Sequence, residues 1–367
     1  MYCVKLLNSF FKIESKDENV FRYVEYFMDS YDSDGEMLEV ENTINIVMHS
    51  GKVPASLPGS KPIKIHTTKH PYWNLSGEYV ENENQRTVLW NTRGFLVTVF
   101  ENALRIEITY DEFLKPVFVG ESLFHVLRGI ALYKRDNKDA NFLHASGIIH
   151  NNKGILFTGA VSAGKTTLLL ESIQKLGAKP LTNDRIFLKS KDEKMMGYSW
   201  PSYASFCEGT ILQYPGLKKG ALAYQYDEEN KYRTIEFNNE LQEAFDKGTK
   251  RVYPMLFLCD CFQTSFAVSS AINTIFISKL DINCKETKIR ELSYCEDYEF
   301  IKNSFQSQTF DTREPSFNPW HGLELGCGTK PVERFITDLQ QAGCKIFEAN
   351  LSPLLMDDFI EYLKKNL

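Results

Sequence analysis

The most informative part of this sequence is Gly159-Ala160-Val161-Ser162-Ala163-Gly164-Lys165-Thr166-Thr167. Its first eight residues match G-x-x-x-x-G-K-[ST], the pattern of a phosphate-binding loop. An apolar, strand-like run, Ile155-Leu156-Phe157-Thr158, precedes it. An amphipathic helix is predicted over residues 165–176, with Gly177 as its C-cap. Strand, glycine loop and helix in this order predict that the loop binds phosphate.

The glycines of this pattern let the backbone turn tightly enough to direct consecutive N–H groups at one anion, next to a helix N-terminus. We therefore expect residues 159–167 to bind ATP, with Lys165 reaching its β- and γ-phosphates. The Thr166 hydroxyl is expected to help hold Mg²⁺, which prefers oxygen ligands. The alternative is a glycine-rich turn with a surface lysine.

Two further candidate residues lie on the strands predicted on either side of this unit. Asp184 belongs to the predicted strand 181–188, 19 residues after Lys165, and is a candidate base or magnesium ligand. The alternative for Asp184 is a turn residue. His144 lies in the predicted strand 142–150 and shares a face with Ser146 by strand alternation. It is either an acid/base or phosphate-contacting residue, or a histidine of the core.

Two weaker patterns lie further along the chain. The apolar run 255–259 is predicted to be a strand, and Asp260 at its end resembles the strand-end aspartate that holds magnesium in many phosphate-loop proteins. Ser278-Lys279-Leu280-Asp281 follows a predicted strand and partly matches the guanine-reading element of GTPases. Each pattern also fits an ordinary strand followed by a loop.

The remaining sequence predicts the domain organisation. Of the 367 residues, 43% are apolar and 25% charged, which excludes disorder, collagen and coiled coil as descriptions of the whole chain. Short β-rich runs predict a β-rich domain over 1–112, and helical spacing predicts a helix over 120–133. The expected fold class is α/β: a phosphate-loop domain over 113–330 follows the β-rich domain. A C-terminal α/β extension over 331–367 completes the chain, with helices at 332–341 and 354–366 around a strand beginning at Cys344.

Composition also limits the partners that we expect. The net charge is −6 without a clustered basic stretch, so no nucleic-acid partner is predicted. The first residues lack the pattern of a signal peptide, and no apolar run approaches the roughly 18 residues of a membrane span, which predicts a cytoplasmic protein without membrane contact. The eight cysteines form no CxxC pair, so reduced thiols are expected. Cys259 and Cys261 are more readily explained as strand-end residues than as metal ligands.

Three segments together resemble the core of the HPr kinase-like group, whose architecture is shared with phosphoenolpyruvate carboxykinase. They are the runs 143–149, 154–167 and 176–185, and the resemblance covers roughly residues 120–190. It implies that His144, Lys165 and Asp184 carry ATP-dependent serine phosphorylation. Asn183 stands where the group has the first residue of an acidic pair, and a neutral amide cannot accept a proton as a carboxylate does.

The resemblance implies a kinase that transfers the γ-phosphate of Mg-ATP to a hydroxyl, most often Ser or Thr of a peptide or protein. It also implies a place in a peptide-modifying pathway. Asp184 or His144 would remove the hydroxyl proton, and Arg185, rather than Arg251 or Arg313, would offset transition-state charge. The Pro-rich stretch 311–321 is expected to line the acceptor cleft. The alternatives are a nucleotide-hydrolysing switch and a catalytically reduced nucleotide-binding module. A homo-oligomer is left open.

Overall fold

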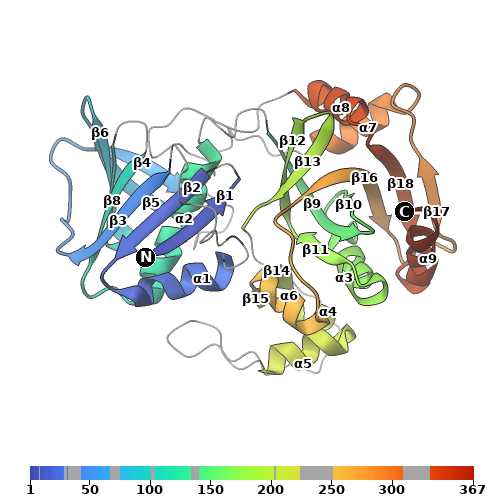
Figure 1. Cartoon of the computed structure of the whole chain (residues 1–367), viewed down its shortest axis with the longest axis horizontal. Coiled ribbons are helices and arrows are strands. Elements are labelled where there is room, and N and C mark those ends of the chain that lie inside the picture. Colours follow the sequence, from blue (N-terminus) through green and yellow to red (C-terminus); the bar gives the residue numbers. More distant parts are fainter. Residues whose placement is uncertain are drawn as a thin grey trace. The chain divides into compact units, whose positions relative to one another are not determined.

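The computed structural model describes the chain apart from residues 8, 29–30, 32–42, 67–74, 101–103, 134–139, 202–203, 224–250 and 309–330. The described residues up to 133 form one compact unit, and those from 140 onward form a second. The protein is a mixed α/β protein whose two large sheets belong to different units (Figure 1). We describe each unit by itself.

The first unit is built on one eight-stranded sheet with the order β1-β2-β3-β8-β7-β6-β5-β4. Its strands alternate buried and exposed residues, as a sheet covered on one face requires. The strands are β1 (Tyr2–Leu6), β2 (Ser9–Ser15), β3 (Ile44–Gly51), β4 (Lys61–His66), β5 (Leu75–Glu81), β6 (Gln85–Trp90), β7 (Phe95–Phe100) and β8 (Arg105–Asp111).

Two helices complete this unit, α1 (Arg22–Met28) and α2 (Pro116–Tyr133). The helix predicted over 120–133 is present and begins four residues earlier. Its apolar side chains are buried, Leu123, Phe124 and Leu127 among them, and Phe124 contacts the ring of Tyr23. Because α2 packs in this way, the first unit extends beyond residue 112, where the sequence predicted the boundary.

The second unit is built around strands that form a closed circuit, β10-β9-β12-β13-β16 and back to β10. Beyond this circuit β18 pairs with β16, β17 pairs with β18, and β11 pairs with β9. The strands are β9 (Asn141–His150), β10 (Lys153–Thr158), β11 (Lys179–Thr182), β12 (Arg185–Lys191), β13 (Lys194–Ser199), β16 (Ser269–Leu280), β17 (Lys288–Glu291) and β18 (Lys345–Leu351). A separate two-stranded sheet pairs β14 (Ala204–Phe206) with β15 (Arg251–Tyr253).

Helices cover both faces of the second unit's large sheet. One apolar cluster joins α3 (Lys165–Leu176) and α9 (Met356–Asn366) to the sheet and to the helices α4 (Glu208–Gln213), α5 (Pro215–Ala223) and α6 (Met255–Phe262). The other cluster joins the sheet to α7 (Tyr298–Gln306) and α8 (Val332–Gln341). The predicted helix over 165–176 is confirmed, and Gly177 ends it in the left-handed conformation.

Three sequence predictions differ from this structure. The strand predicted over 181–188 is two strands, β11 and β12, and Asp184 lies in the bend between them. The run 255–259 forms helix α6, so the prediction that Asp260 ends a strand is wrong, and Cys259 and Cys261 are helical. A short continuous apolar run fits a buried strand and a buried helix equally well, which explains the error. Residues 331–367 were expected as an extension, but β18 pairs in parallel with β16 and is part of the large sheet.

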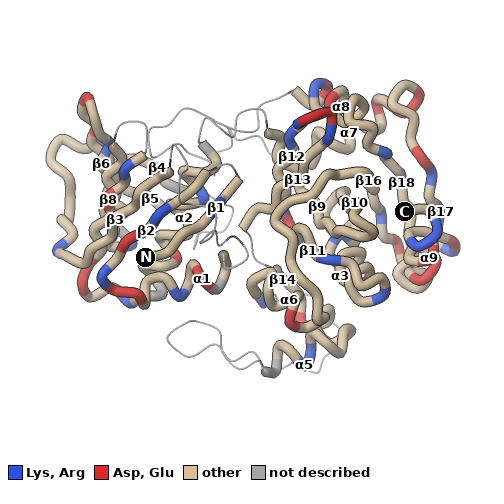
Figure 2. Tube along the Cα trace, in the orientation of Figure 1, with Lys and Arg blue, Asp and Glu red and all other residues tan. Residues whose placement is uncertain are grey.

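Charges of both signs are interspersed along the chain, as the blue and red segments of β17 and α9 illustrate (Figure 2). In the part of the chain that the structure describes, no helix combines the length and apolar character needed to cross a membrane.

Candidate functional site

The glycine loop, residues 159–164, connects the end of β10 to the start of α3. Three of its residues have positive φ: Gly159 at 146°, Ser162 at 67° and Gly164 at 84°. A Cβ on Gly159 would lie 2.4 Å from the carbonyl oxygen of Ser278, so this position has room only for glycine. The loop thus has the left-handed turns that a backbone anion site requires.

Lys165 begins α3, and its side chain folds back over the glycine loop. Its Nζ donates to the carbonyl oxygens of Gly159, at 2.8 Å, and Ala160, at 2.9 Å. The residue is 8% exposed. Burial lowers the pKa of Lys165, and the negative charge of Asp184 partly opposes this shift. Two carbonyl oxygens thus hold the ammonium group at the loop. A phosphate oxygen can replace them as hydrogen-bond acceptor.

Hydrogen bonds fix the glycine loop relative to β9. The Ser146 hydroxyl donates to the carbonyl oxygen of Lys165 at 2.6 Å, and the Thr158 hydroxyl donates to that of His144 at 2.9 Å. Ser146 therefore lies on the α3 side of the sheet, while Ala145 belongs to the apolar cluster on the other side. Strand alternation had predicted this division of faces but not the two hydroxyl contacts.

Asp184 and His144 come together next to this loop. Oδ1 of Asp184 lies 3.3 Å from Nε2 of His144, and the backbone N–H of Ala145 donates to the carbonyl oxygen of Asp184. Nε of Arg185 lies 3.1 Å from Oδ2 of Asp184. The side chains are partly exposed, 42% for Asp184 and 28% for His144. The Asp184 carboxylate, the His144 imidazole and the Arg185 guanidinium thus form one accessible cluster. We refer to these three side chains as the Asp184 group.

Asn183 precedes this group in the bend between β11 and β12. The residue is 7% exposed, and its Oδ1 has no hydrogen-bond partner among the described residues. A buried amide oxygen without a partner costs about 1–3 kcal/mol. The neighbouring Thr182 hydroxyl is occupied, because it donates to the carbonyl oxygen of Arg185. Asn183 is therefore a buried acceptor, not an exposed turn residue.

The oxygen donors available for Mg²⁺ are the Thr166 hydroxyl, at the second position of α3, and the partly exposed carboxylate of Asp184. The described residues contain no cluster of three or more His, Cys, Asp or Glu side chains that could hold a metal. Mg²⁺ on nucleotides is usually held by one or two protein oxygens, with water and phosphate completing its shell. The residues present fit this kind of site.

The other predicted residues lie elsewhere or outside the described part. Arg251 in β15 pairs with Glu208 at 2.7 Å, a contact distinct from the Asp184 group. Arg313 and the stretch 311–321 lie outside the described residues. Ser278 and Lys279 lie near the end of strand β16 rather than in a loop. The Ser278 hydroxyl donates to the carbonyl oxygen of Thr158. Val161 belongs to the glycine loop, and Thr167 belongs to the first turn of α3.

Sequence comparison adds little to this geometry. No protein-family model matches the chain, and no curated protein matches it. Among solved structures, the HPr(Ser) kinase/phosphatase from Coxiella burnetii is similar over 61% of this chain and 94% of its own, with 13% identity and a TM-score of 0.28. At this TM-score the similarity by itself assigns no activity.

Proposed function

We propose that this protein is an ATP-dependent kinase that transfers the γ-phosphate to a hydroxyl group, most often that of Ser or Thr in a peptide or protein. The observation that carries the proposal is the joining of the glycine loop to the Asp184 group through β9. On this strand, residues 144–146 hold Thr158, Asp184 and Lys165 by three hydrogen bonds. The glycine loop and the Asp184–His144 pair are thus fixed to the same short segment, which supports the proposal.

The loop and Lys165 would bind the triphosphate. The Lys165 ammonium exchanges its carbonyl acceptors for phosphate oxygens, whose greater negative charge makes a stronger hydrogen bond. The positive end of α3 adds to this attraction. Thr166 and Asp184 would hold Mg²⁺, which when bound neutralises charge on the phosphate oxygens. The proposal thus assigns phosphate binding to the start of α3.

The Asp184 group would activate the acceptor. An acceptor hydroxyl placed at the exposed carboxylate loses its proton to Asp184 or, through it, to His144 as the oxygen attacks. Arg185 offsets the negative charge of Asp184 and of the transferring group. The acceptor O–H bond and the bond from the γ-phosphorus to the β,γ-bridging oxygen break, and one bond from the acceptor oxygen to the γ-phosphorus forms. ADP is the leaving group, and the proton stays on the Asp184–His144 pair. Asn183 supplies no second carboxylate, so Asp184 carries both roles.

Transfer from γ-labelled ATP tests the proposal. Wild-type protein with Mg²⁺ is incubated with cell lysate and with a library of Ser- and Thr-containing peptides. Lys165→Ala and Asp184→Asn are expected to lower transfer by about 10²- to 10⁴-fold. Asp357→Asn is the matched control, because this carboxylate pairs with Lys175 and is 82% exposed. Transfer to this control should equal that of wild type.

Two outcomes would contradict the proposal. Labelled free phosphate without a labelled acceptor would support the nucleotide-hydrolysing switch. A nucleotide that raises the melting temperature and is never turned over would support the binding module, since any ligand of the folded state alone stabilises it. The neutral Asn183 is the observation that favours this last alternative.

A further inference from the structure

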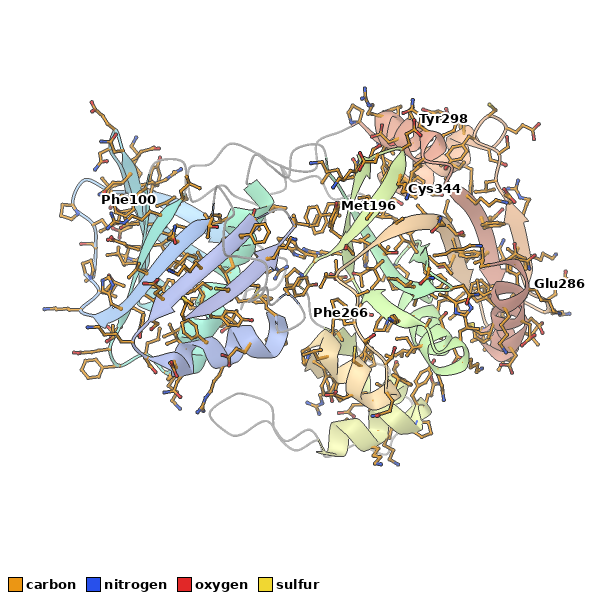
Figure 3. All side chains as sticks on the ribbon, in the orientation of Figure 1. Phe100, Met196, Phe266, Glu286, Tyr298 and Cys344 are labelled. Atoms are coloured by element: carbon orange, nitrogen blue, oxygen red, sulfur yellow. The ribbon has the colours of Figure 1, made fainter. Side chains whose placement is uncertain are left out.

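Three loops of the second unit meet at one edge of its large sheet. Strands β10, β16 and β18 are neighbours and pair in parallel, so their carboxyl ends point the same way. The glycine loop follows β10, residues 281–287 follow β16, and residues 352–355 follow β18. Glu286, labelled in Figure 3, belongs to the second of these loops. In α/β proteins with parallel strands, ligands commonly bind at the carboxyl ends of the strands.

The three loops are fixed relative to one another. A Cβ on Gly164 would lie 3.0 Å from side-chain atoms of Leu280, so the glycine loop is in close contact with the end of β16. The N–H of Asp281 donates to the carbonyl oxygen of Leu351 at 2.9 Å, and the Thr287 hydroxyl donates to that of Leu355 at 3.4 Å. The loops after β16 and β18 therefore form one surface beside the glycine loop.

This surface exposes apolar side chains. Ile282 is 60% exposed and Leu354 is 77% exposed, while Leu280 is half-buried and packs on the apolar cluster beneath. One exposed apolar side chain is ordinary in a folded protein. Two of them, on adjoining loops that begin where β16 and β18 end, form an apolar surface next to a glycine loop.

We propose that Leu280, Ile282 and Leu354 contact the purine base of the bound nucleotide. The inference rests on the proposed function. Strand β10 has β9 on one side and β16 on the other. The Asp184 group is held by β9, so a triphosphate whose γ-phosphate faces Asp184 directs its nucleoside toward β16. The apolar surface lies on that side, and aliphatic side chains there cover a flat aromatic ring that would otherwise stay in water.

A comparison of ATP with tripolyphosphate distinguishes contacts to the base from contacts to the phosphates. Dissociation constants for ATP and for inorganic tripolyphosphate, both with Mg²⁺, are measured by calorimetry on wild type and on the double variant Ile282→Ser/Leu354→Ser. We expect the double variant to bind ATP about tenfold more weakly, because a few tens of Å² of apolar contact are lost. Its affinity for tripolyphosphate should equal that of wild type. The matched control is Phe113→Ser, an 87% exposed residue of the first unit, which should change neither constant.

The outcomes distinguish this inference from the proposed function. Equal ATP affinity of wild type and double variant would overturn the base surface and leave phosphate binding intact. Wild type that binds ATP no more tightly than tripolyphosphate would do the same. Wild type that binds neither ligand would overturn the proposed function, and the base surface with it. Equal losses for both ligands in the double variant would show damage to the glycine loop, against the inference.

Discussion

The hydroxyl of Ser146 donates a 2.6 Å hydrogen bond to the carbonyl oxygen of Lys165. This contact joins the middle of β9 to the first residue of α3, and both groups are buried. The position of the Lys165 backbone, and with it the end of the glycine loop, is therefore set by a strand that also carries His144. The glycine loop and the Asp184 group are therefore joined through this strand.

Ser146→Ala removes this contact while keeping the side chain small. We expect the free energy of unfolding to fall by about 1–2 kcal/mol, since a buried carbonyl loses a hydrogen-bond donor. ATP affinity should fall several-fold, because the start of α3 is less firmly positioned. Urea unfolding and calorimetry measure the two effects. Ser307→Ala is the control: its hydroxyl also donates to a carbonyl, that of Ser304, but at an exposed site. Equal stability of the two variants would contradict the argument.

The pKa of Lys165 predicts how ATP binding depends on pH. Burial lowers this pKa below the ordinary 10.5, and only the protonated form attracts phosphate. The ammonium is present below the shifted pKa and is lost as pH rises through it. ATP affinity should therefore decline at a lower pH than an ordinary lysine, with its pKa of 10.5, would require. Dissociation constants from pH 7 to 10 test this expectation.

The exposed Lys345 supplies the control for this pH dependence. Lys345→Ala should retain the alkaline decline, because this side chain lies at the amino end of β18, away from the glycine loop, and is 59% exposed. Lys165→Ala should bind weakly at every pH and show no decline. A wild-type affinity that stays constant up to pH 10 would be evidence against a role of the Lys165 charge.

Sequence patterns predicted the elements around the glycine loop well because several independent signals agree there. The helix 165–176 has helical spacing and a terminal Gly177, and α8 coincides with the predicted helix 332–341. Where only one signal existed, the prediction was wrong: the apolar run 255–259 is part of α6. The insertion of β18 beside β16 depends on contacts distant in sequence, which local patterns do not contain.

The same difference applies to the candidate site. Alternation placed His144 and Ser146 on one face, and the structure brings His144 to 3.3 Å from Asp184. The hydroxyl contacts of Ser146 and Thr158 were missed, since Ser and Thr in strands are common and carry no distinctive spacing. The buried state of Asn183 was also missed, because burial of a bend residue depends on what packs over it.

The variant Asn183→Asp tests how much a second carboxylate beside Asp184 lowers the free energy of unfolding. A carboxylate at this buried position, beside Asp184, has a raised pKa, because burial and a like charge both disfavour ionisation. The loss of unfolding free energy is absent below the pKa of about 4 that this carboxyl has in the unfolded chain. It grows as the pH rises toward the higher pKa of the folded state. We therefore expect a loss of about 1–3 kcal/mol in unfolding free energy at pH 8 and a smaller loss at pH 5. Urea unfolding at both pH values measures it.

The matched control for this variant is Asn283→Asp, which lies in the exposed loop after β16. It should change stability by little at either pH. A pH-independent loss in Asn183→Asp would point to a packing effect rather than to ionisation. Transfer from γ-labelled ATP by the same variant shows whether a second carboxylate raises the activity.

Cysteine labelling tests the environment of the thiols. Burial raises the pKa of Cys259 to about 11 and those of Cys261 and Cys344 to about 12. The thiolate is the reactive form, so these three should react slowly with iodoacetamide at pH 8. Among the cysteines that the structure describes, Cys295 is exposed and should be alkylated first. Mass spectrometry of digests taken over time gives the order, and early labelling of Cys261 would contradict the packing of α6.

Alanine variants of two glycines distinguish backbone strain from steric exclusion. Gly159 lies in the glycine loop, and Gly343 follows α8. Both have positive φ, 146° and 67°, so alanine strains the backbone at either position. At Gly343 a Cβ meets nothing within 4 Å, whereas at Gly159 it meets the Ser278 carbonyl oxygen at 2.4 Å. Gly343→Ala should therefore cost about 1 kcal/mol, and Gly159→Ala about 2–4 kcal/mol, because the loop must also move away from β16. The displaced loop should bind ATP at least tenfold more weakly, while Gly343→Ala binds normally. Urea unfolding and calorimetry on the two variants decide the matter, and equal costs with equal ATP affinity would mean that the contact between Gly159 and Ser278 does not shape the loop.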